Sequence, residues 1–177
     1  TLRVGHPELV DAARVPLAIP VTNQAWYEIR APGLLVSANT FVGSGTNRAW
    51  SPQGVVNLTS DSPDFVGAWQ VYSGALWASS SYALGAHNAG AVYLNTQGGP
   101  PGSQALWLSG DIGITGKLAV TSGRGFTNIT SAIPNAGDFT NTVALGPGVI
   151  RSISGTNVWA GHVEMAGGAG SSGFAAD

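Results

Sequence analysis

Glycine and proline divide this chain more finely than any other feature of its sequence. The 177 residues include 26 glycines and 10 prolines, spread over the whole length. The runs between them are short and rich in Val, Ile, Thr, Trp and Tyr, which is the composition of β-strands. Because such runs leave little room for helices, the sequence predicts an all-β protein.

Two runs alternate most clearly between apolar and other side chains. Residues 111–121 predict a half-buried strand with an apolar face formed by Ile112, Ile114, Leu118 and Val120, and a polar face formed by Thr115, Lys117 and Thr121. In residues 64–77 both faces are partly apolar, with Phe65, Trp69 and Val71 on one of them, which predicts a central strand.

Further strands are expected at a spacing of about 8 to 12 residues, with turn residues between them. This spacing is typical of a β-sandwich or a jelly-roll-like barrel, so we expect one of these two architectures. The additional candidate strands are residues 15–22, 25–30, 33–38, 54–59, 89–95, 104–109, 124–130, 141–146, 148–154 and 157–165.

The two ends of the chain differ from its body. Residues 6–16, HPELVDAARVP, predict a helix of about two turns, because Pro7 suits a first helical position and Pro16 ends the pattern. Proline cannot donate to a β-ladder, so Pro16 and Pro20 restrict the following stretch to a sheet edge or a surface path. We therefore expect an N-terminal arm (1–20), a sandwich or barrel domain (21–165) and a Gly/Ser-rich tail (166–177).

The chain carries few charges. Charged residues make up 9% of the sequence, against about 25% in ordinary soluble domains, and the net charge is −2. Much of the surface must then be neutral or apolar, and such a surface promotes association. The composition therefore favours a protein whose surface is covered in part by other subunits.

Composition also excludes several partners. The seven basic residues are scattered singly, whereas binding to nucleic acid or to an anionic membrane needs a cluster of them. The sequence contains no run of about 18 apolar residues, which is the length that crosses a membrane. Its first residues also lack the basic and then apolar pattern of a secretory signal. Cysteine is absent, so disulfides and thiolate metal sites are excluded. We expect synthesis in a cytoplasm, no direct contact with nucleic acid, and no membrane association.

No catalytic pattern stands out. The sequence lacks the G-x-S-x-G motif, and its histidines, His6, His87 and His162, are far apart. His162 and Glu164 fall on one face of an expected strand, but no third metal ligand is evident. Most aspartates lie beside Gly, Pro or Ser, as in turns. We expect neither catalysis nor a metal or cofactor, although a site assembled from distant loops stays open.

The tail contains Gly168, Gly170 and Gly173 at the spacing of a pyrophosphate-binding loop. That motif must open a helix, and only four residues follow Gly173, so we reject a nucleotide site. The alternative is a tail that becomes ordered by contact. Phe174, its one large apolar residue, is the expected anchor.

Tryptophan offers the remaining candidates for binding. Trp69, Trp77, Trp107 and Trp159 lie in expected strands, where a place in the core is the default. Trp50 lies in TNRAWSPQG, an expected loop, and is the best candidate for contact with a glycan or a protein partner. The tripeptide Ala-Leu-Trp at 75–77 recurs at 105–107, either by coincidence or as two equivalent core positions.

An arm, an all-β body, a glycine-rich tail and few charges together resemble accessory proteins of bacteriophage virions, such as head-decoration or cement proteins and short fibres. The resemblance implies a structural virion protein that stabilises a capsid as a homo-oligomer, with a trimer favoured, in contact with other capsid proteins. The alternative is a glycan-binding or receptor-binding module that uses Trp50 and the loop at 97–103. The expected assembly contacts are Leu2, Val4, Leu9, Val10, Leu17, Ile19 and Phe174.

Overall fold

The computed structural model describes residues 3–4, 20–30, 34–94, 104–121, 125, 148–165 and 174–176. This part of the chain contains strands and no helix, which confirms the all-β class. It therefore offers no helix that could span a membrane. The strands are β1 (Arg3–Val4), β2 (Pro20–Thr22), β3 (Trp26–Arg30), β4 (Leu34–Ser37), β5 (Thr40–Val42), β6 (Thr46–Leu58), β7 (Ala68–Ala78), β8 (Ala91–Leu94), β9 (Gln104–Ser109), β10 (Gly113–Thr115), β11 (Leu118–Thr121), β12 (Ile150–Ser154), β13 (Val158–Ala160), β14 (Val163–Met165) and β15 (Phe174–Ala176).

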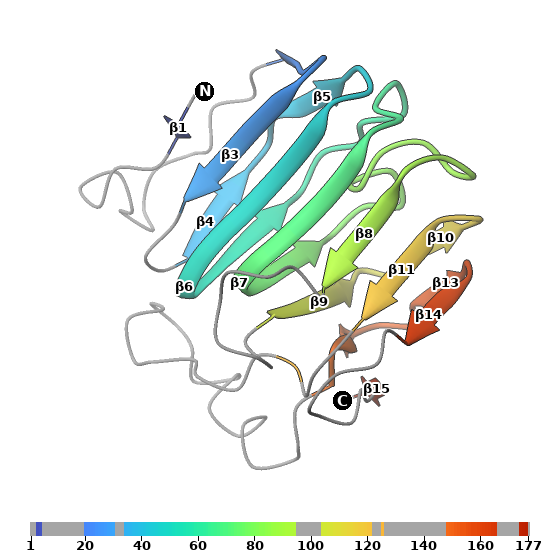
Figure 1. Ribbon diagram of the computed structural model, residues 1–177. Coiled ribbons are helices and arrows are strands. Elements are labelled where there is room, and N and C mark those ends of the chain that lie inside the picture. Colours follow the sequence, from blue (N-terminus) through green and yellow to red (C-terminus); the bar gives the residue numbers. More distant parts are fainter. Residues whose placement is uncertain are drawn as a thin grey trace.

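Every strand pair in the described residues is parallel, from β1 with β3 to β12 with β15. A β-sandwich or jelly roll is built from antiparallel strands, so the predicted sandwich or jelly-roll-like barrel is wrong. Parallel neighbours cannot be joined by a tight hairpin, and the chain must travel around before it pairs again. It does so by winding into a coil with three faces, a parallel β-helix (Figure 1).

The first face is the sheet nearest the viewer in Figure 1. It runs in the order β1, β3, β6, β7, β8, β11, β14, so that each turn of the coil adds one strand. The second face contains β4, the later parts of β6 and β7, then β9, β12 and β15. β6 and β7 each continue through both faces, and the register of β6 against β7 shifts between Trp50 and Val55, at the bend.

The third face is the shortest. β2 pairs with β5 and β10 pairs with β13. Between these pairs the backbone continues the ladder, because Gly43 and Phe65 form a bridge and the amide of Ala86 donates to the carbonyl of Phe65 at 2.8 Å. The amide of Asn88 then donates to the carbonyl of Thr115 at 3.1 Å. The third face thus connects the same successive turns as the other two.

The turns differ in length, which hides the repeat in the sequence. Partners are about 20 residues apart between β3 and β6, but about 44 apart between β11 and β14. The repeated Ala-Leu-Trp marks one such turn, since residues 75–77 pair position by position with residues 105–107. The repeated tripeptide is therefore not a coincidence, because its two copies occupy equivalent positions in successive turns.

The core is a set of side-chain columns parallel to the coil axis. On the second face, one column contains Leu35, Val56, Leu76, Leu106, Ile150 and Phe174, one from each turn. Near the N-terminal turns the interior is aromatic: Phe41 packs edge-on against Trp69, with ring centroids 5.2 Å apart, and also against Tyr27. Trp69 and Val71 are fully buried, and β7 lies between β6 and β8, which confirms the central strand predicted for residues 64–77.

The predicted strand over residues 111–121 is interrupted at Gly116 and Lys117. Gly116 has a φ of 65°, and the chain turns a corner there between β10 on the third face and β11 on the first. The inside–outside alternation restarts after the corner, so Lys117 is buried whereas Leu118 is only half-buried. The prediction of one continuous apolar face is therefore wrong, because it assumed a straight strand.

Two short pieces of the terminal segments extend the sheets. β1, which contains Val4, pairs with β3, and β15, which begins at Phe174, pairs with β12. These pieces of the expected arm and tail thus pair with strands of their own chain. The predicted helix over 6–16, and Leu2, Leu9, Val10, Leu17 and Ile19, lie outside the described residues.

Candidate functional site

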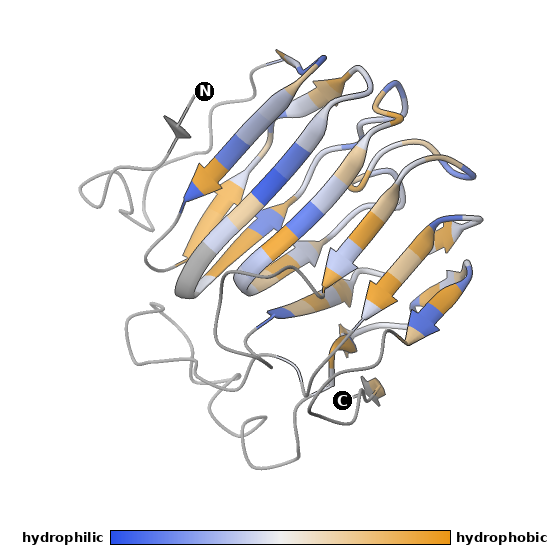
Figure 2. Ribbon diagram, viewed as in Figure 1, coloured by the Kyte–Doolittle hydropathy of each residue, from blue (hydrophilic) through white to orange (hydrophobic). Residues whose placement is uncertain are grey.

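The outward side of the first face carries a group of aromatic and charged residues near the N-terminal end of the coil. Alternate residues of a strand point to opposite sides of a sheet, and the inward positions here, such as Tyr27 and Ile29, belong to the core. The intervening positions carry polar and aromatic groups, seen as hydrophilic positions along β3, β6 and β7 (Figure 2). We call the following six residues the outer cluster: Trp26, Glu28, Arg30, Arg48, Trp50 and Tyr72.

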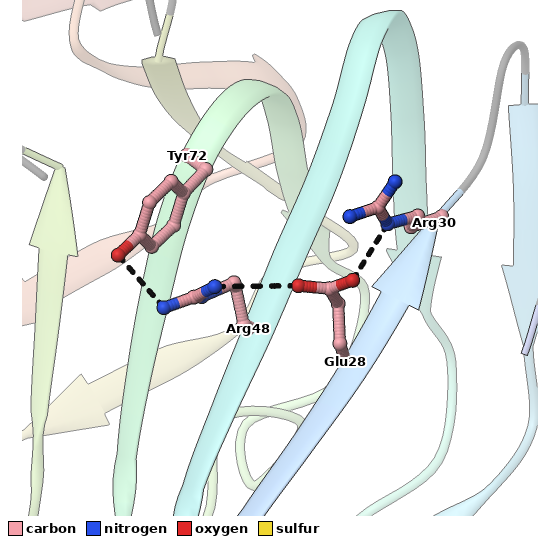
Figure 3. Close-up of polar contacts among 4 residues, drawn as sticks. All are labelled: Glu28, Arg30, Arg48 and Tyr72. Atoms are coloured by element: carbon pink, nitrogen blue, oxygen red, sulfur yellow. Dashed lines mark hydrogen bonds and ion pairs between the residues drawn. The ribbon is translucent and has the colours of Figure 1, made fainter. Parts of the chain in front are cut away.

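Glu28 is the centre of the outer cluster (Figure 3). Its carboxylate accepts from Nε of Arg30, on the same strand, at 2.6 Å and from a terminal nitrogen of Arg48, on β6, at 3.3 Å. The other terminal nitrogen of Arg48 donates to the hydroxyl of Tyr72, on β7, at 2.8 Å. The contacts therefore connect three successive turns, and Glu28 itself is only 1% exposed.

Aromatic rings hold both guanidinium groups. Arg48 lies over Trp26 at 4.4 Å and over Tyr72 at 3.8 Å from the ring centroids. Arg30 lies over Trp50 at 4.1 Å, and Trp50 in turn stacks on Tyr72 with centroids 5.9 Å apart. These contacts fix the planes of the arginines, because a guanidinium over a ring face is attracted by the quadrupole of the ring. The result is a rigid polar surface rather than a set of mobile side chains.

A second feature is the C-terminal end of the coil, formed by β13, β14 and β15 (Figure 1). Each of these strands has one partner in the described part of the chain: β10, β11 and β12 respectively. Met165 and Phe174 occupy positions that continue interior columns, opposite Thr121 and Ile150, yet they are 56% and 60% exposed. Among the residues that the structure describes, no further strand covers the interior of the coil at this end.

Two residues that the sequence predicts as contact residues, Trp50 and Phe174, lie in different parts of the coil. Trp50 lies in β6 and not in a loop, so that prediction is wrong; it is half-buried, with Arg30 over its ring and Tyr72 stacked on it. A strand was missed here because the Asn, Ser and Pro residues around Trp50 are typical of turns. Phe174 lies at the open C-terminal end and is far from Trp50 along the coil axis.

The other polar candidates are either structural or exposed. The ring of His87 stacks on Tyr82 with centroids 4.3 Å apart, and its Nδ1 is 2.9 Å from the hydroxyl of Thr115. Glu164 in β14 and His162 directly before it are both exposed, as expected for a polar pair on the solvent face of an edge strand. No three His, Cys, Asp or Glu side chains gather into a metal site among the residues described.

Two aspartates confirm the predicted role of acidic residues in turns. Asp61 accepts from the amide of Tyr82 at 3.0 Å, and Asp111 accepts from the amide of Thr156 at 2.6 Å. Asp111 also has a φ of 59°, in the left-handed region that aspartate tolerates better than most residues. These carboxylates stabilise the corners between the strands.

Sequence reasoning missed Glu28, Arg30 and Arg48 as a group. Glu28 and Arg30 are two positions apart in AWYEIR, and Arg48 and Trp50 are two positions apart in NRAW. In each of these triplets, 28–30 and 48–50, the first and third side chains therefore lie on the same side of a strand. What brings the two triplets together is the pairing of Glu28 with Arg48 and of Arg30 with Trp50. Only the solenoid architecture would have given that register.

The chain was also compared with known proteins, and neither a family model, nor a curated protein, nor a solved structure matches it.

Proposed function

We propose that the protein is a structural module of a larger assembly, an elongated β-helical rod that associates with further copies through its C-terminal end. The observation that carries the proposal is the exposure of Met165 and Phe174 at that end, where no described strand follows β13, β14 or β15. Phe174 extends a column that is buried from Val56 to Ile150, and Met165 follows the buried Thr121, but Phe174 and Met165 stay more than half exposed. A copy that adds a strand there would satisfy the strand edges and cover both side chains.

Covering the exposed side chains at the C-terminal end would contribute a useful free energy of association. Full burial of a Phe or Met side chain contributes about 1.5–3 kcal/mol, so covering two half-exposed side chains gives on the order of 2–3 kcal/mol. The edges of β13, β14 and β15 add backbone hydrogen bonds, by which a further parallel strand extends a sheet. Together these terms support a specific end-on contact rather than nonspecific stickiness.

The setting we propose is a virion, in which such a rod acts as a short fibre or a decoration protein on a capsid. The support is the resemblance in composition: few charges, many glycines and a neutral surface, all of which suit a subunit covered by neighbours. A trimer, and contacts with other capsid proteins, are what that resemblance implies.

The experiment is a measurement of mass in solution by analytical ultracentrifugation over a wide range of concentrations. We expect the wild-type protein to associate, and the double variant Met165→Ser with Phe174→Ser to remain a single chain. Val158→Ser is the matched control, because Val158 is 51% exposed on the same turn but pairs with Gly113 outside the interior columns. Association should survive in that variant.

Two results would contradict the proposal. One is a wild-type protein that has the mass of a single chain at every concentration. The other is association that persists unchanged in the double variant, which would move the contact away from this end. A thermal melt of each variant shows whether the fold itself is retained.

A further inference from the structure

The outer cluster carries more positive than negative charge. Two guanidinium groups share the one carboxylate of Glu28, and the register of β1 puts a third arginine, Arg3, in the position next to Glu28 on the ladder. In a chain with a net charge of −2 and with basic residues otherwise scattered singly, this local excess is unusual. It attracts anionic groups to the N-terminal part of the first face.

Arg30 is the part of this group that is open to a ligand. Its Nε is bound to Glu28, but its two terminal nitrogens have no hydrogen-bond partner among the residues that the structure describes. The side chain is 39% exposed, against 19% for Arg48. The free edge of the guanidinium presents two parallel N–H groups, the geometry that binds a carboxylate in a bidentate way.

The site is also held in place before any ligand arrives. The ring of Trp50 lies below the guanidinium of Arg30, and Glu28 fixes its Nε, so little side-chain entropy remains to be lost on binding. Most exposed arginines lose that entropy when they bind an anion. Arg30 has already lost most of that entropy when the protein folds.

The surroundings favour a sugar chain over a small anion. Beyond Arg48, the same ladder position holds Gln70 and then Tyr93, both half-buried and both able to hydrogen-bond with hydroxyl groups. Successive positions on this ladder are about 4.8 Å apart, along a flat sheet face. A row of this kind fits an extended polymer with many hydroxyls. Nucleic acid is disfavoured, because it requires several clustered cations with free edges.

We propose that the outer cluster binds an acidic polysaccharide, with Arg30 holding a sugar carboxylate and the Gln70–Tyr93 row holding hydroxyls of neighbouring sugars. The surface is separate from the C-terminal end, so this proposal stands independently of end-on association.

The test is isothermal titration calorimetry at low salt with a hexamer of galacturonic acid as the probe. A neutral glucose hexamer and a short oligothymidylate are the comparison ligands. The variants are Arg30→Gln, which removes the fork and its charge, and Arg30→Lys, which keeps the charge alone. Arg14→Gln is the control, because it lowers the net charge by the same amount elsewhere in the sequence.

We expect the galacturonic acid hexamer to bind the wild-type protein and the Arg14→Gln control equally. Arg30→Gln should weaken binding roughly tenfold or more, the size expected for losing one charge-assisted interaction, with Arg30→Lys between the two. Failure of the wild-type protein to bind the acidic hexamer, equal binding by Arg30→Gln, or equal binding of the neutral hexamer would overturn the proposal. Tighter binding of the oligothymidylate would replace it by a nucleic-acid site. Matched thermal midpoints exclude unfolding as the cause.

Discussion

Three glycines at one corner of the coil determine how closely successive turns approach each other. Gly45, Gly67 and Gly90 each directly precede a strand of the first face, in three successive turns. A Cβ atom on Gly67 would collide with the carbonyl oxygen of Gly45, and one on Gly90 with that of Gly67. Any other residue would push these turns apart, so the glycines are required by contact rather than by flexibility alone.

This predicts a large effect from a single methyl group. Gly67→Ala should lower the free energy of unfolding by about 2–4 kcal/mol, because the new atom meets backbone that cannot move without breaking the ladder. Gly113→Ala is the control, since a Cβ there meets nothing within 4 Å, and a change within about 1 kcal/mol is expected. Urea unfolding followed by circular dichroism measures both. Equal stabilities of the two variants would show that the turns can separate at this corner.

Among the elements, the corner between β10 and β11 is unusual because it holds a lysine where the neighbouring turns hold glycine. Lys117 occupies the corner position that glycine holds in the turns before and after it, and it is 1% exposed. Its Nζ donates to the carbonyl oxygen of Ala89, in the preceding turn. Burial lowers the pKa of Lys117 from 10.5 to about 8, because removal from water disfavours the charged form.

The lowered pKa of Lys117 makes the free energy of unfolding depend on pH. Between about pH 8 and 10.5 the unfolded chain binds more protons at Lys117 than the folded chain does, so the contribution of this group to stability rises with pH. Below pH 8 the cost of burying the charge is fully present. Relative to Lys117→Met, the wild-type protein should therefore gain up to about 3 kcal/mol as the pH rises through this window.

Urea unfolding of both proteins at several pH values measures this difference. Comparison with Lys117→Met also cancels the opposing effect of Tyr27, whose pKa is raised by burial. Because Lys117 is the sole lysine of the sequence, its titration can be followed directly by NMR of the protein labelled in lysine alone. A pKa near 10.5 in the folded protein, or a stability difference that does not change with pH, would contradict this account.

For the whole molecule, each turn contacts only the turns next to it. The sheets place β6 and β7 between neighbours on both sides, whereas β13, β14 and β15 have a described neighbour on one side only. In such a solenoid, stability is a sum of contributions from each turn and from each contact between adjacent turns. The C-terminal turn should therefore open more easily than the middle of the rod.

Hydrogen exchange measured by mass spectrometry tests this gradient. Amides of β6 and β7 are expected to exchange most slowly, and amides of β13 to β15 fastest among the strands. Conditions in which the protein is a single chain are needed, since end-on association would protect the same strands. Uniform protection along the chain would indicate that the rod unfolds as one unit, contrary to its local contacts.

The sequence alone determined the strands better than their arrangement. Composition and turn residues located β3, β4, β8 and β9 closely, because β-branched and aromatic residues between glycines favour extended chain wherever the strand pairs. The apolar residues on both faces of the run around Trp69 and Val71 also gave a central strand correctly. Both properties are local, so they can be recognised in a single stretch of sequence.

The tertiary structure decided how the strands pair and which side chains meet. Whether neighbours are parallel depends on the path between them, and turns of unequal length conceal a coil whose one visible trace was the repeated Ala-Leu-Trp. Glu28 and Arg48 are distant in sequence and meet because β3 and β6 pair in register, and Tyr72 joins them at the register shift between β6 and β7. Likewise, only the columns of the coil show that Phe174 continues a core and is left uncovered.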